Sequence, residues 1–311
     1  MALIVGFGVA VILSPIAAWA ATRVGLVDRP GPLKVQQHAV PYAGGIAVLL
    51  AIAVPVAVDR PSLLVPLGLA CALGLADDVL DLPVKIRLPA EVLLGGLVAW
   101  MVAPHDVWHL AAALVVELVL LNAVNLLDGL DGLAAIVTLA GAAGFAVVLA
   151  GAVSTLALAL VGALAGFLVW NRPPARVYLG DAGSYLIGTA LAVMLADAMH
   201  HGAPIISGAL LFVGVPVGDT IIAIVRRARA RRPVLRGDRG HVYDQLVDRG
   251  WPLHASVLAC AAAQVVLTAV GIGIASLPSS TAIALAGATI SCIGVAALVS
   301  FTSPRSWAAE R

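Results

Sequence analysis

Eleven long apolar runs follow one another along the chain and leave little sequence between them. They cover approximately residues 2–22, 43–58, 62–76, 89–104, 108–127, 132–150, 154–170, 184–199, 204–225, 253–275 and 281–302. A helix needs roughly 20 apolar residues to cross a bilayer, and several of these runs are near the short limit of about 17. Hydrophobic residues make up 61% of the chain, charged residues 11%, and the mean hydropathy is +1.05. We therefore predict an all-α, polytopic integral membrane protein with ten or eleven transmembrane helices.

Charge and cysteine usage exclude several other classes of protein. The formal net charge of +1 offers no basic field for nucleic acid. The three cysteines all lie within apolar runs, without metal-ligand spacing, and are expected to be small core residues. Ala18-Trp19-Ala20 resembles a signal-peptide cleavage site, but neither Lys nor Arg precedes it. The first run is therefore predicted to be a retained helix, in a single transmembrane domain over residues 1–311.

The distribution of Lys and Arg predicts the orientation in the membrane. Alternate loops and the C-terminal tail hold 17 of the 18 Lys and Arg, whereas the opposite loops hold only Arg60. Those alternate loops are 23–42, 77–88, 122–131, 171–183 and 226–252. By the positive-inside rule they are cytoplasmic, with the N-terminus outside and the C-terminus inside. The unusual polar residues fall in the same loops, so we expect an active site on the cytoplasmic face of a cell membrane.

The first polar cluster ends the third run, in "ADDVLDLPVKIRL". Asp77 and Asp81 share a helix face by i,i+4 spacing, and Asp78 adjoins them. Carboxylates this close repel one another unless a cation neutralises them, either a hard divalent ion or a partner such as Lys85 or Arg87. A solvated helix end is the alternative.

The second cluster, "NAVNLLDGLDGL" at 122–133, places amides and carboxylates at three-residue steps inside apolar sequence. Its polar members are Asn122, Asn125, Asp128 and Asp131. At the bilayer centre each Asp would cost roughly 3 kcal/mol. Gly129 and Gly132 permit a helix break that would turn the carboxylates toward a common point. The segment is therefore expected to line a hydrated cavity or a bound ligand, or else to form a polar contact between helices.

The third cluster is "NRPPARVYLGDAGS" at 171–184, with Asp181 between Gly180 and Gly183 before the eighth run. Glycines allow close backbone approach, and a helix N-terminus with free N–H groups favours phosphate. A plain N-cap role for Asp181 is the alternative.

The fourth cluster, "GDRGHVYDQLVDRG" at 237–250, follows an arginine run at 226–232. Most of that run is expected to anchor the chain at lipid headgroups. Arg236, Arg239 and His241 lie further along in a turn-rich loop, where they are better placed for a phosphate ligand.

In combination these motifs resemble glycosyltransferase family 4, the polyprenyl-phosphate N-acetylhexosamine-1-phosphate transferases. The resemblance runs in order from Val27 to Gly250 through "VDRPGPLK…VPYAGG", "DDVLDLPVK", "NAVNLLDGLDGLA", "NRPPARVYLGDAGS" and "PVGDTIIAIVRR" with the His loop. This family includes phospho-N-acetylmuramoyl-pentapeptide translocase and the initiating N-acetylglucosamine-1-phosphate transferases, and the chain resembles the latter more.

The resemblance implies a reaction and its participants. A polyprenyl phosphate (undecaprenyl or decaprenyl) attacks the sugar-bearing phosphorus of a UDP-N-acetylhexosamine, and UMP leaves. The product initiates a cell-wall or surface glycan. Mg²⁺ is the expected cofactor, with Mn²⁺ as a substitute, and a homodimer is an open expectation.

The resemblance also implies roles for individual residues. Asp77 and Asp78 match the paired catalytic carboxylates. Asp181 matches the Mg²⁺ ligand, and Asp78 is expected to be a second metal residue. The residues expected to bind substrate are Lys34, Asn122, Asn125, Asp128, Asp131, Asn171, Gly180, Asp219, Arg239 and His241.

The sequence departs from the family pattern at two informative places. Asp81 stands where the muramoyl-pentapeptide branch usually carries Lys, and Asp is usual in the N-acetylglucosamine branch. The family's His-x-His-His loop reads His241-Val242-Tyr243-Asp244, so two of its three histidines are absent. This second departure affects donor contacts and therefore sugar identity.

Three alternative functions compete with this interpretation. A phospho-N-acetylmuramoyl-pentapeptide transferase is the nearest. A transporter would also carry intramembrane carboxylates, although here they cluster at one face. The CDP-alcohol phosphatidyltransferases use an Asp-Gly-x-x-Ala-Arg pattern, which fails because Ile136 stands where Arg is needed.

Overall fold

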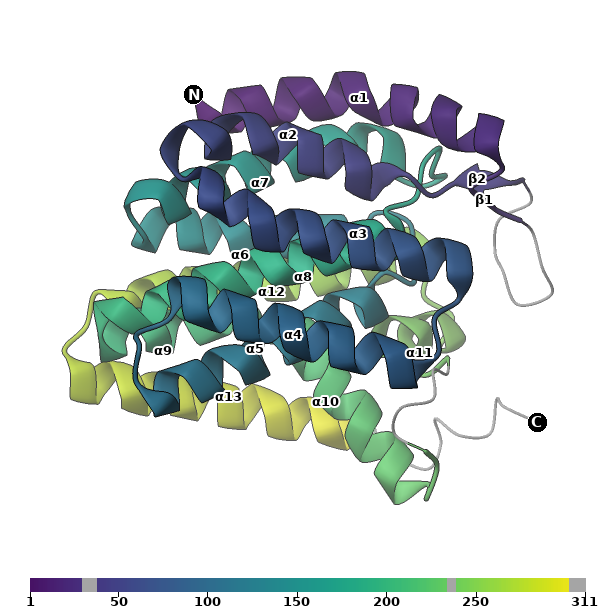
Figure 1. Cartoon of the computed structure of the whole chain (residues 1–311). Coiled ribbons are helices and arrows are strands. Elements are labelled where there is room, and N and C mark those ends of the chain that lie inside the picture. The colour runs from purple at the N-terminus through teal and green to yellow at the C-terminus, as the bar shows by residue number, and fades with distance from the viewer. Residues whose placement is uncertain (30–37, 234–238, 302–311) are drawn as a thin grey trace.

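The computed structural model describes residues 1–29, 38–233 and 239–301, which form a bundle of roughly parallel and antiparallel helices (Figure 1). The long helices are α1 (Ala2–Val24), α2 (Gly44–Asp59), α3 (Leu64–Leu80), α4 (Val84–Val102), α5 (Val107–Leu127), α6 (Leu133–Val148), α7 (Gly151–Asn171), α8 (Gly180–Ala198), α9 (Ala203–Phe212), α10 (Gly214–Arg229), α12 (Leu253–Ala275) and α13 (Ser279–Phe301). The short elements are α11 (Val242–Asp248), the 3₁₀ turns η1 (Pro61–Leu63) and η2 (Met199–His201), and the antiparallel strands β1 (Val27–Asp28) and β2 (Val40–Pro41).

Each of the eleven apolar runs folds as helix, and the ninth is divided into α9 and α10. Among the described residues, seven helices are long and apolar enough to cross a membrane, or up to eight if α9 and α10 form one broken span. α2 and α6 are apolar but shorter. The prediction of an all-α, multi-pass membrane protein is confirmed. The number of spans and the orientation stay predictions.

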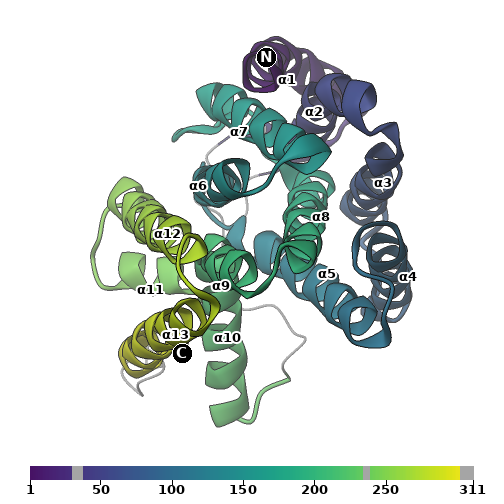
Figure 2. The ribbon, with the colours of Figure 1, turned by 90° about the vertical axis from the view of Figure 1, so that its left-hand side faces the viewer.

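α8 lies at the centre of the bundle and is surrounded by the other helices (Figure 2). In the apolar stretch of α8 that could span a membrane, 89% of the residues are buried inside the protein. The corresponding share is 11% for α13, which lies at the periphery. Small residues let neighbouring helices approach it closely. A Cβ on Gly74 of α3 would collide with the backbone of Asp181 and Ala182, so only glycine permits this contact. This approach places the end of α3 beside the start of α8.

Polar segments break the helices at one end of the bundle. α5 ends at Leu127, and Gly132 adopts a φ of 76° immediately before α6 begins. Gly180 likewise has a φ of 71° at the start of α8. Because L-residues rarely adopt this conformation, glycine is the residue that suits both turns. The break expected at Gly129 and Gly132 is therefore present, between Leu127 and Leu133.

The loops predicted to be cytoplasmic meet at that same end, near β1, β2 and α11, on the right of Figure 1. The opposite end has only short connections between helices, at 60–63, 103–106, 149–150, 199–202 and 276–278. The clustered polar residues of the sequence thus converge on one side of the bundle.

Candidate active site

A cavity of about 1000 Å³ opens at the end of the bundle where these loops meet. Its wall combines residues from all four polar clusters of the sequence with residues near β2 and at the start of α12. The lining residues that carry polar side chains are Asp28, His38, Tyr42, Asp78, Asn125, Asp128, Asp131, Asn171, Tyr178, Asp181, Arg239, Tyr243 and Asp244. Among these described residues carboxylates outnumber cations, so the cavity favours a positively charged or metal-bound ligand.

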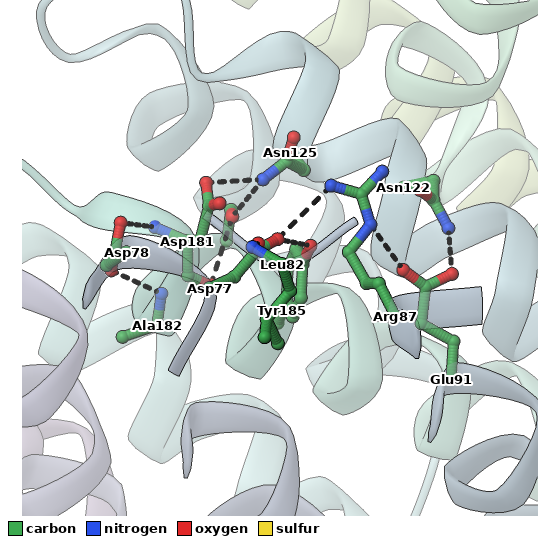
Figure 3. A network of polar contacts seen from close by, with 11 residues as sticks. Asp77, Asp78, Leu82, Arg87, Glu91, Asn122, Asn125, Asp181, Ala182 and Tyr185 are labelled. Carbon is green, nitrogen blue, oxygen red and sulfur yellow. Dashed lines mark hydrogen bonds and ion pairs between the residues drawn. The ribbon is translucent and has the colours of Figure 1, made fainter. Parts of the chain in front are cut away.

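The carboxylate of Asp78 closes the N-terminus of α8. Its Oδ1 accepts a hydrogen bond from the backbone N–H of Asp181 at 3.0 Å, and its Oδ2 accepts one from Ala182 at 3.1 Å (Figure 3). A Cβ at position 180 would lie 2.8 Å from Asp78 Oδ2, which accounts for Gly180. An anion is stabilised there by the helix dipole. The expectation that these N–H groups are free for phosphate is therefore wrong for these two, because Asp78 occupies them.

Asp181 lies in the first turn of α8 and faces the cavity beside Asn125 of α5. Asn125 donates one hydrogen bond to Asp181 Oδ1 at 2.7 Å and another to Ser184 Oγ at 3.2 Å (Figure 3). Leu179 occupies the N-cap position of α8 and Asp181 is the second residue of the helix, so the simple N-cap alternative for Asp181 is not supported. The amide of Asn125 instead fixes the orientation of the Asp181 carboxylate.

Asp128 follows the last residue of α5 and lies among three other carboxylates. Burial raises its pKa well above the ordinary value, and the nearby charges of Asp181, Asp78 and Asp131 raise it further. Among the described residues no hydrogen bond reaches its carboxylate. A buried carboxylate in this environment is stabilised by protonation or by a cation.

The donor set fits a hard divalent cation held with few protein ligands. Within the described ranges no group of three or more His, Cys, Asp or Glu side chains is arranged to enclose a metal. Mg²⁺, however, keeps several waters and commonly uses one or two carboxylates together with substrate phosphates. Asp181 and Asp128 supply such carboxylates at the cavity wall, and Asp78 adjoins them.

Asp77 lies on the other side of the α3 end, away from the cavity wall. Its Oδ2 accepts from Tyr185 Oη at 2.7 Å and from Arg87 at 3.1 Å, and its Oδ1 accepts from the Leu82 N–H at 2.9 Å. The two adjacent carboxylates thus have different hydrogen-bond partners and different surroundings. Asp78 faces the cavity, whereas Asp77 is enclosed by hydrogen-bond donors.

Arg87 continues this network away from the cavity. Its Nε lies 3.2 Å from Glu91 Oε1, and Glu91 Oε2 accepts from Asn122 at 2.8 Å (Figure 3). Of the partners that the sequence offered for the acidic cluster, Arg87 forms an ion pair with Asp77. Asn122 points toward Glu91 rather than the cavity, so the structure does not bring it to the other predicted substrate residues.

Asn171 and Asp131 hold the loops of the cavity together. The buried Asn171 amide accepts from the Gly132 N–H at 3.0 Å and donates to the Val177 carbonyl at 2.9 Å. Asp131 Oδ2 accepts from the Ala175 N–H at 2.8 Å. The segment after α5 is therefore tied to the segment after α7, and both side chains reach the cavity wall.

The α11 segment forms the remaining wall. Tyr243 donates to the Leu126 carbonyl at 2.9 Å, and Asp244 lies 3.9 Å from Arg239 Nε. His241 is buried, with Nδ1 2.6 Å from Asp219 Oδ2, and Asp219 Oδ1 accepts from the Val242 N–H. His241 and Asp219 thus fix the start of α11 and do not line the cavity.

Eight of the predicted site residues line one cavity, although they come from segments that lie far apart in the sequence. They are Asp78, Asn125, Asp128, Asp131, Asn171, Gly180, Asp181 and Arg239. Four others, namely Asp77, Asn122, Asp219 and His241, lie behind it. Lys34 and Arg236 are outside the described residues. Whether any of these residues binds substrate or metal stays a prediction.

Several residues of the site were not among the sequence-based candidates. Tyr178 lines the cavity, and burial together with the charge of Asp131 raises the pKa of its hydroxyl. Tyr185 and Glu91 support Asp77 and Arg87 from within helices. The role of Glu91 could have been predicted from the sequence. A glutamate inside an apolar run needs a partner, and Arg87 lies one helical turn away.

The helical bundle and its acidic cavity define a multi-pass membrane protein with a cluster of carboxylates at one end. A glycosyl transferase family 4 model matches residues 61–199. This range includes most of the cavity wall and the network behind it.

Similar proteins extend the match over most of the chain. The chain is 30% identical to a decaprenyl-phosphate N-acetylglucosaminephosphotransferase of Mycolicibacterium smegmatis, over 82% of this chain and 77% of the relative. It is 28% identical to a probable undecaprenyl-phosphate N-acetylglucosaminyl 1-phosphate transferase of Bacillus subtilis, over 83% and 80%. It is 29% identical to an undecaprenyl-phosphate alpha-N-acetylglucosaminyl 1-phosphate transferase of Thermotoga maritima, over 72% and 73%.

The chain therefore belongs to glycosyl transferase family 4 and is a phosphoglycosyl transferase. The family assignment made from the motifs is confirmed.

Proposed function

We propose that this enzyme transfers N-acetylglucosamine 1-phosphate from UDP-N-acetylglucosamine to an undecaprenyl or decaprenyl phosphate and releases UMP. The names of the relatives support a polyprenyl phosphate acceptor and a phosphorylated N-acetylglucosamine donor. The observation that carries the proposal is the acidic cavity, in which Asp78, Asp128 and Asp181 converge at the N-terminus of α8. In the proposed reaction the lipid would enter from the membrane and the sugar nucleotide from water, and a cavity that opens at one end of the helical bundle suits both.

We infer that Mg²⁺ is held by Asp181 and Asp128, with Asp78 beside them. When bound, the ion would neutralise the carboxylates and the donor pyrophosphate and stabilise charge that develops at the reacting phosphate. Asn125 would orient the Asp181 carboxylate through its 2.7 Å hydrogen bond.

The reaction exchanges one phosphoanhydride for another. An acceptor phosphate oxygen forms a bond to the sugar-bearing phosphorus of the donor, and the bond from that phosphorus to the UMP oxygen breaks. The protein's contribution is to position the two phosphates and to stabilise their charge. Asp78 would hold the start of α8 in place, and Arg239 would contact the donor from the rim, where its side chain is 56% exposed.

The charge of the wall favours a donor sugar without acidic substituents. Asp131 and Asp244 line the cavity in addition to the carboxylates that would bind metal. A muramoyl-pentapeptide donor brings extra carboxylates, which would meet this negative surface at a cost. N-acetylglucosamine carries none, and it is the sugar in the names of the relatives, so it is the proposed sugar.

We further propose that the cavity faces the cytoplasm in a cell membrane and that the product initiates a cell-wall or surface glycan. The support for this orientation is the placement of 17 of the 18 Lys and Arg in loops of one set.

A donor panel tests the proposal. The purified chain in bilayer nanodiscs, supplied with undecaprenyl phosphate and Mg²⁺, should release UMP from UDP-N-acetylglucosamine. It should release much less from UDP-N-acetylgalactosamine or UDP-N-acetylmuramoyl-pentapeptide. Removal of the divalent ion with EDTA should stop the release, and added Mg²⁺ or Mn²⁺ should restore it. Preference for the pentapeptide donor would replace this function with the muramoyl alternative.

A further inference from the structure

The break between α9 and α10, which together have the length and composition of one broken membrane span, interrupts the backbone hydrogen bonds of the helix. The two helices meet at 67° around Val213, where Gly214 and Pro216 interrupt the helical ladder. In a bilayer the backbone groups at such a break need partners within the protein, because no water is available to hydrogen-bond them. A partner for the break has to come from a neighbouring helix.

Gln264 of α12 supplies that partner. Its Oε1 accepts from the Val215 N–H at 3.0 Å, and its Nε2 donates to the Leu211 carbonyl at 3.0 Å. One side chain therefore bonds both helices that flank the break. Gln264 is fully buried, and a second contact of its Nε2 with Thr268 Oγ1 at 3.2 Å fixes the amide. A primary amide is suited to this position because it offers an acceptor and two donors.

The direction of α10 decides where one wall of the cavity lies. Asp219 of α10 bonds both His241 and the Val242 N–H, so the start of α11 is attached to α10. α11 in turn presents Tyr243 and Asp244 to the cavity. Figure 2 shows α10 extending away from the bundle below α9, with α12 beside α9.

The side of α12 that carries Gln264 also reaches the cavity. Val257 lines the cavity and lies seven residues, or two helical turns, before Gln264. Thr268 follows one turn later and donates to the Ala140 carbonyl of α6 at 3.2 Å. The helix that holds the break is therefore also part of the cavity wall.

We propose that Gln264 is a positioning residue, which sets the bend between α9 and α10 and through it the α11 wall of the donor cavity. The effect on donor use rests on the proposed function, whereas the effect on the bend does not. Gln264 itself does not touch the cavity, and it acts through Asp219 and α11.

Two spin labels measure the bend without any activity. Cysteines would replace Ala228, exposed near the end of α10, and Leu93, an exposed residue of α4, with the exposed Cys292 changed to Ser. Ala228 lies roughly 21 Å along the helix from Gly214, so a 10° change in bend moves it by about 4 Å. Gln264→Leu should shift or broaden the distance distribution by at least about that amount.

The variants separate hydrogen bonding from packing. Gln264→Glu, whose protonated carboxyl offers one acceptor and one donor, should keep the parental distance. Ser256→Ala, a change at another fully buried polar residue of α12, should also keep it, because the Ser256 hydroxyl donates to the Pro252 carbonyl and to neither flank of the break. Gln264→Leu should raise the KM for UDP-N-acetylglucosamine roughly 3- to 20-fold with little change in kcat.

Each outcome decides the inference. A parental distance in Gln264→Leu overturns the inference. An equal shift in Ser256→Ala, or a shift in Gln264→Glu as large as that in Gln264→Leu, also overturns it. A shifted distance with unchanged donor KM refutes the link to the cavity. If the parental chain does not use UDP-N-acetylglucosamine at all, the proposed function fails while the distance measurement still stands.

Discussion

Asp78→Asn tests the contact that joins the two halves of the site. The carboxylate accepts two backbone hydrogen bonds, from Asp181 at 3.0 Å and Ala182 at 3.1 Å. The Asn side chain has only one acceptor oxygen, so only one of the two hydrogen bonds can form. Its NH₂ group would face the other backbone N–H, and two donors cannot bond each other. Loss of a charge-assisted bond costs about 1.5–3 kcal/mol, and loss of the anion at a helix N-terminus adds about 0.3–1 kcal/mol. Together these amount to roughly 2–4 kcal/mol, or about a 30- to 1000-fold loss of kcat/KM.

The assay is UMP release by purified variants, with thermal unfolding measured in parallel. Asp81→Asn is the matched control because it makes the same change one turn later at an exposed position. Asp81 has a φ of 48°, a conformation that Asn also tolerates. We expect this control to keep activity within about threefold of the parent. Parental activity in Asp78→Asn, or an equal loss in both variants, would refute the reasoning.

Three further predictions concern single side chains. Asp181→Asn should abolish turnover in a protein that still inserts and folds, and excess Mg²⁺ should not restore it; measurable turnover in the purified variant would remove Asp181 from the metal site. Arg239→Ala should raise the donor KM about tenfold through a lost charge-assisted contact, at the low end of the range because Arg239 is half exposed; an unchanged KM would make it a surface anchor. Burial raises the pKa of the Asp244 carboxyl, so its contribution to stability is present at low pH and is lost as pH rises through that pKa. Asp244→Asn should therefore raise the Tm near pH 8 but not near about pH 4, where the unfolded carboxyl titrates; an equal shift at both pH values would contradict this.

The sequence predicted the helices well because their signal is local. Each apolar run has helical length, and the glycine at position 132 marked the break before α6. The four polar clusters were expected at a common face, and they do converge on one cavity. The order of the apolar runs and the charge of the loops were sufficient to predict that the clusters share one face. Both can be read directly from the sequence.

The orientation of individual side chains was less accessible. Asp77 and Asp78 are adjacent in sequence, yet a rotation of about 100° per residue turns one into the cavity and the other toward Tyr185 and Arg87. Occupation of the α8 N–H groups by Asp78 depends on the close approach of α3 at Gly74. Such contacts arise from tertiary packing, and no spacing rule contains them.

The α11 segment shows the same limit. The sequence indicated a phosphate-binding loop with His241 reaching the donor, whereas the structure buries His241 against Asp219 of α10. These residues are 22 positions apart, and a 67° bend between α9 and α10 precedes Asp219. The sequence predicted one helix over 204–225, and it predicted neither the break at Val213 nor the role of Gln264 in holding it.

The most direct test of the central claim is the stoichiometry of product formation. The full chain would be incubated with UDP-N-acetylglucosamine, undecaprenyl phosphate and Mg²⁺, and UMP and the lipid products would be quantified by mass spectrometry. We predict one polyprenyl-pyrophosphate-N-acetylglucosamine for each UMP released, with neither product formed by Asp181→Asn. UMP released without the lipid-linked sugar, or the sugar joined to lipid through a single phosphate, would contradict the account.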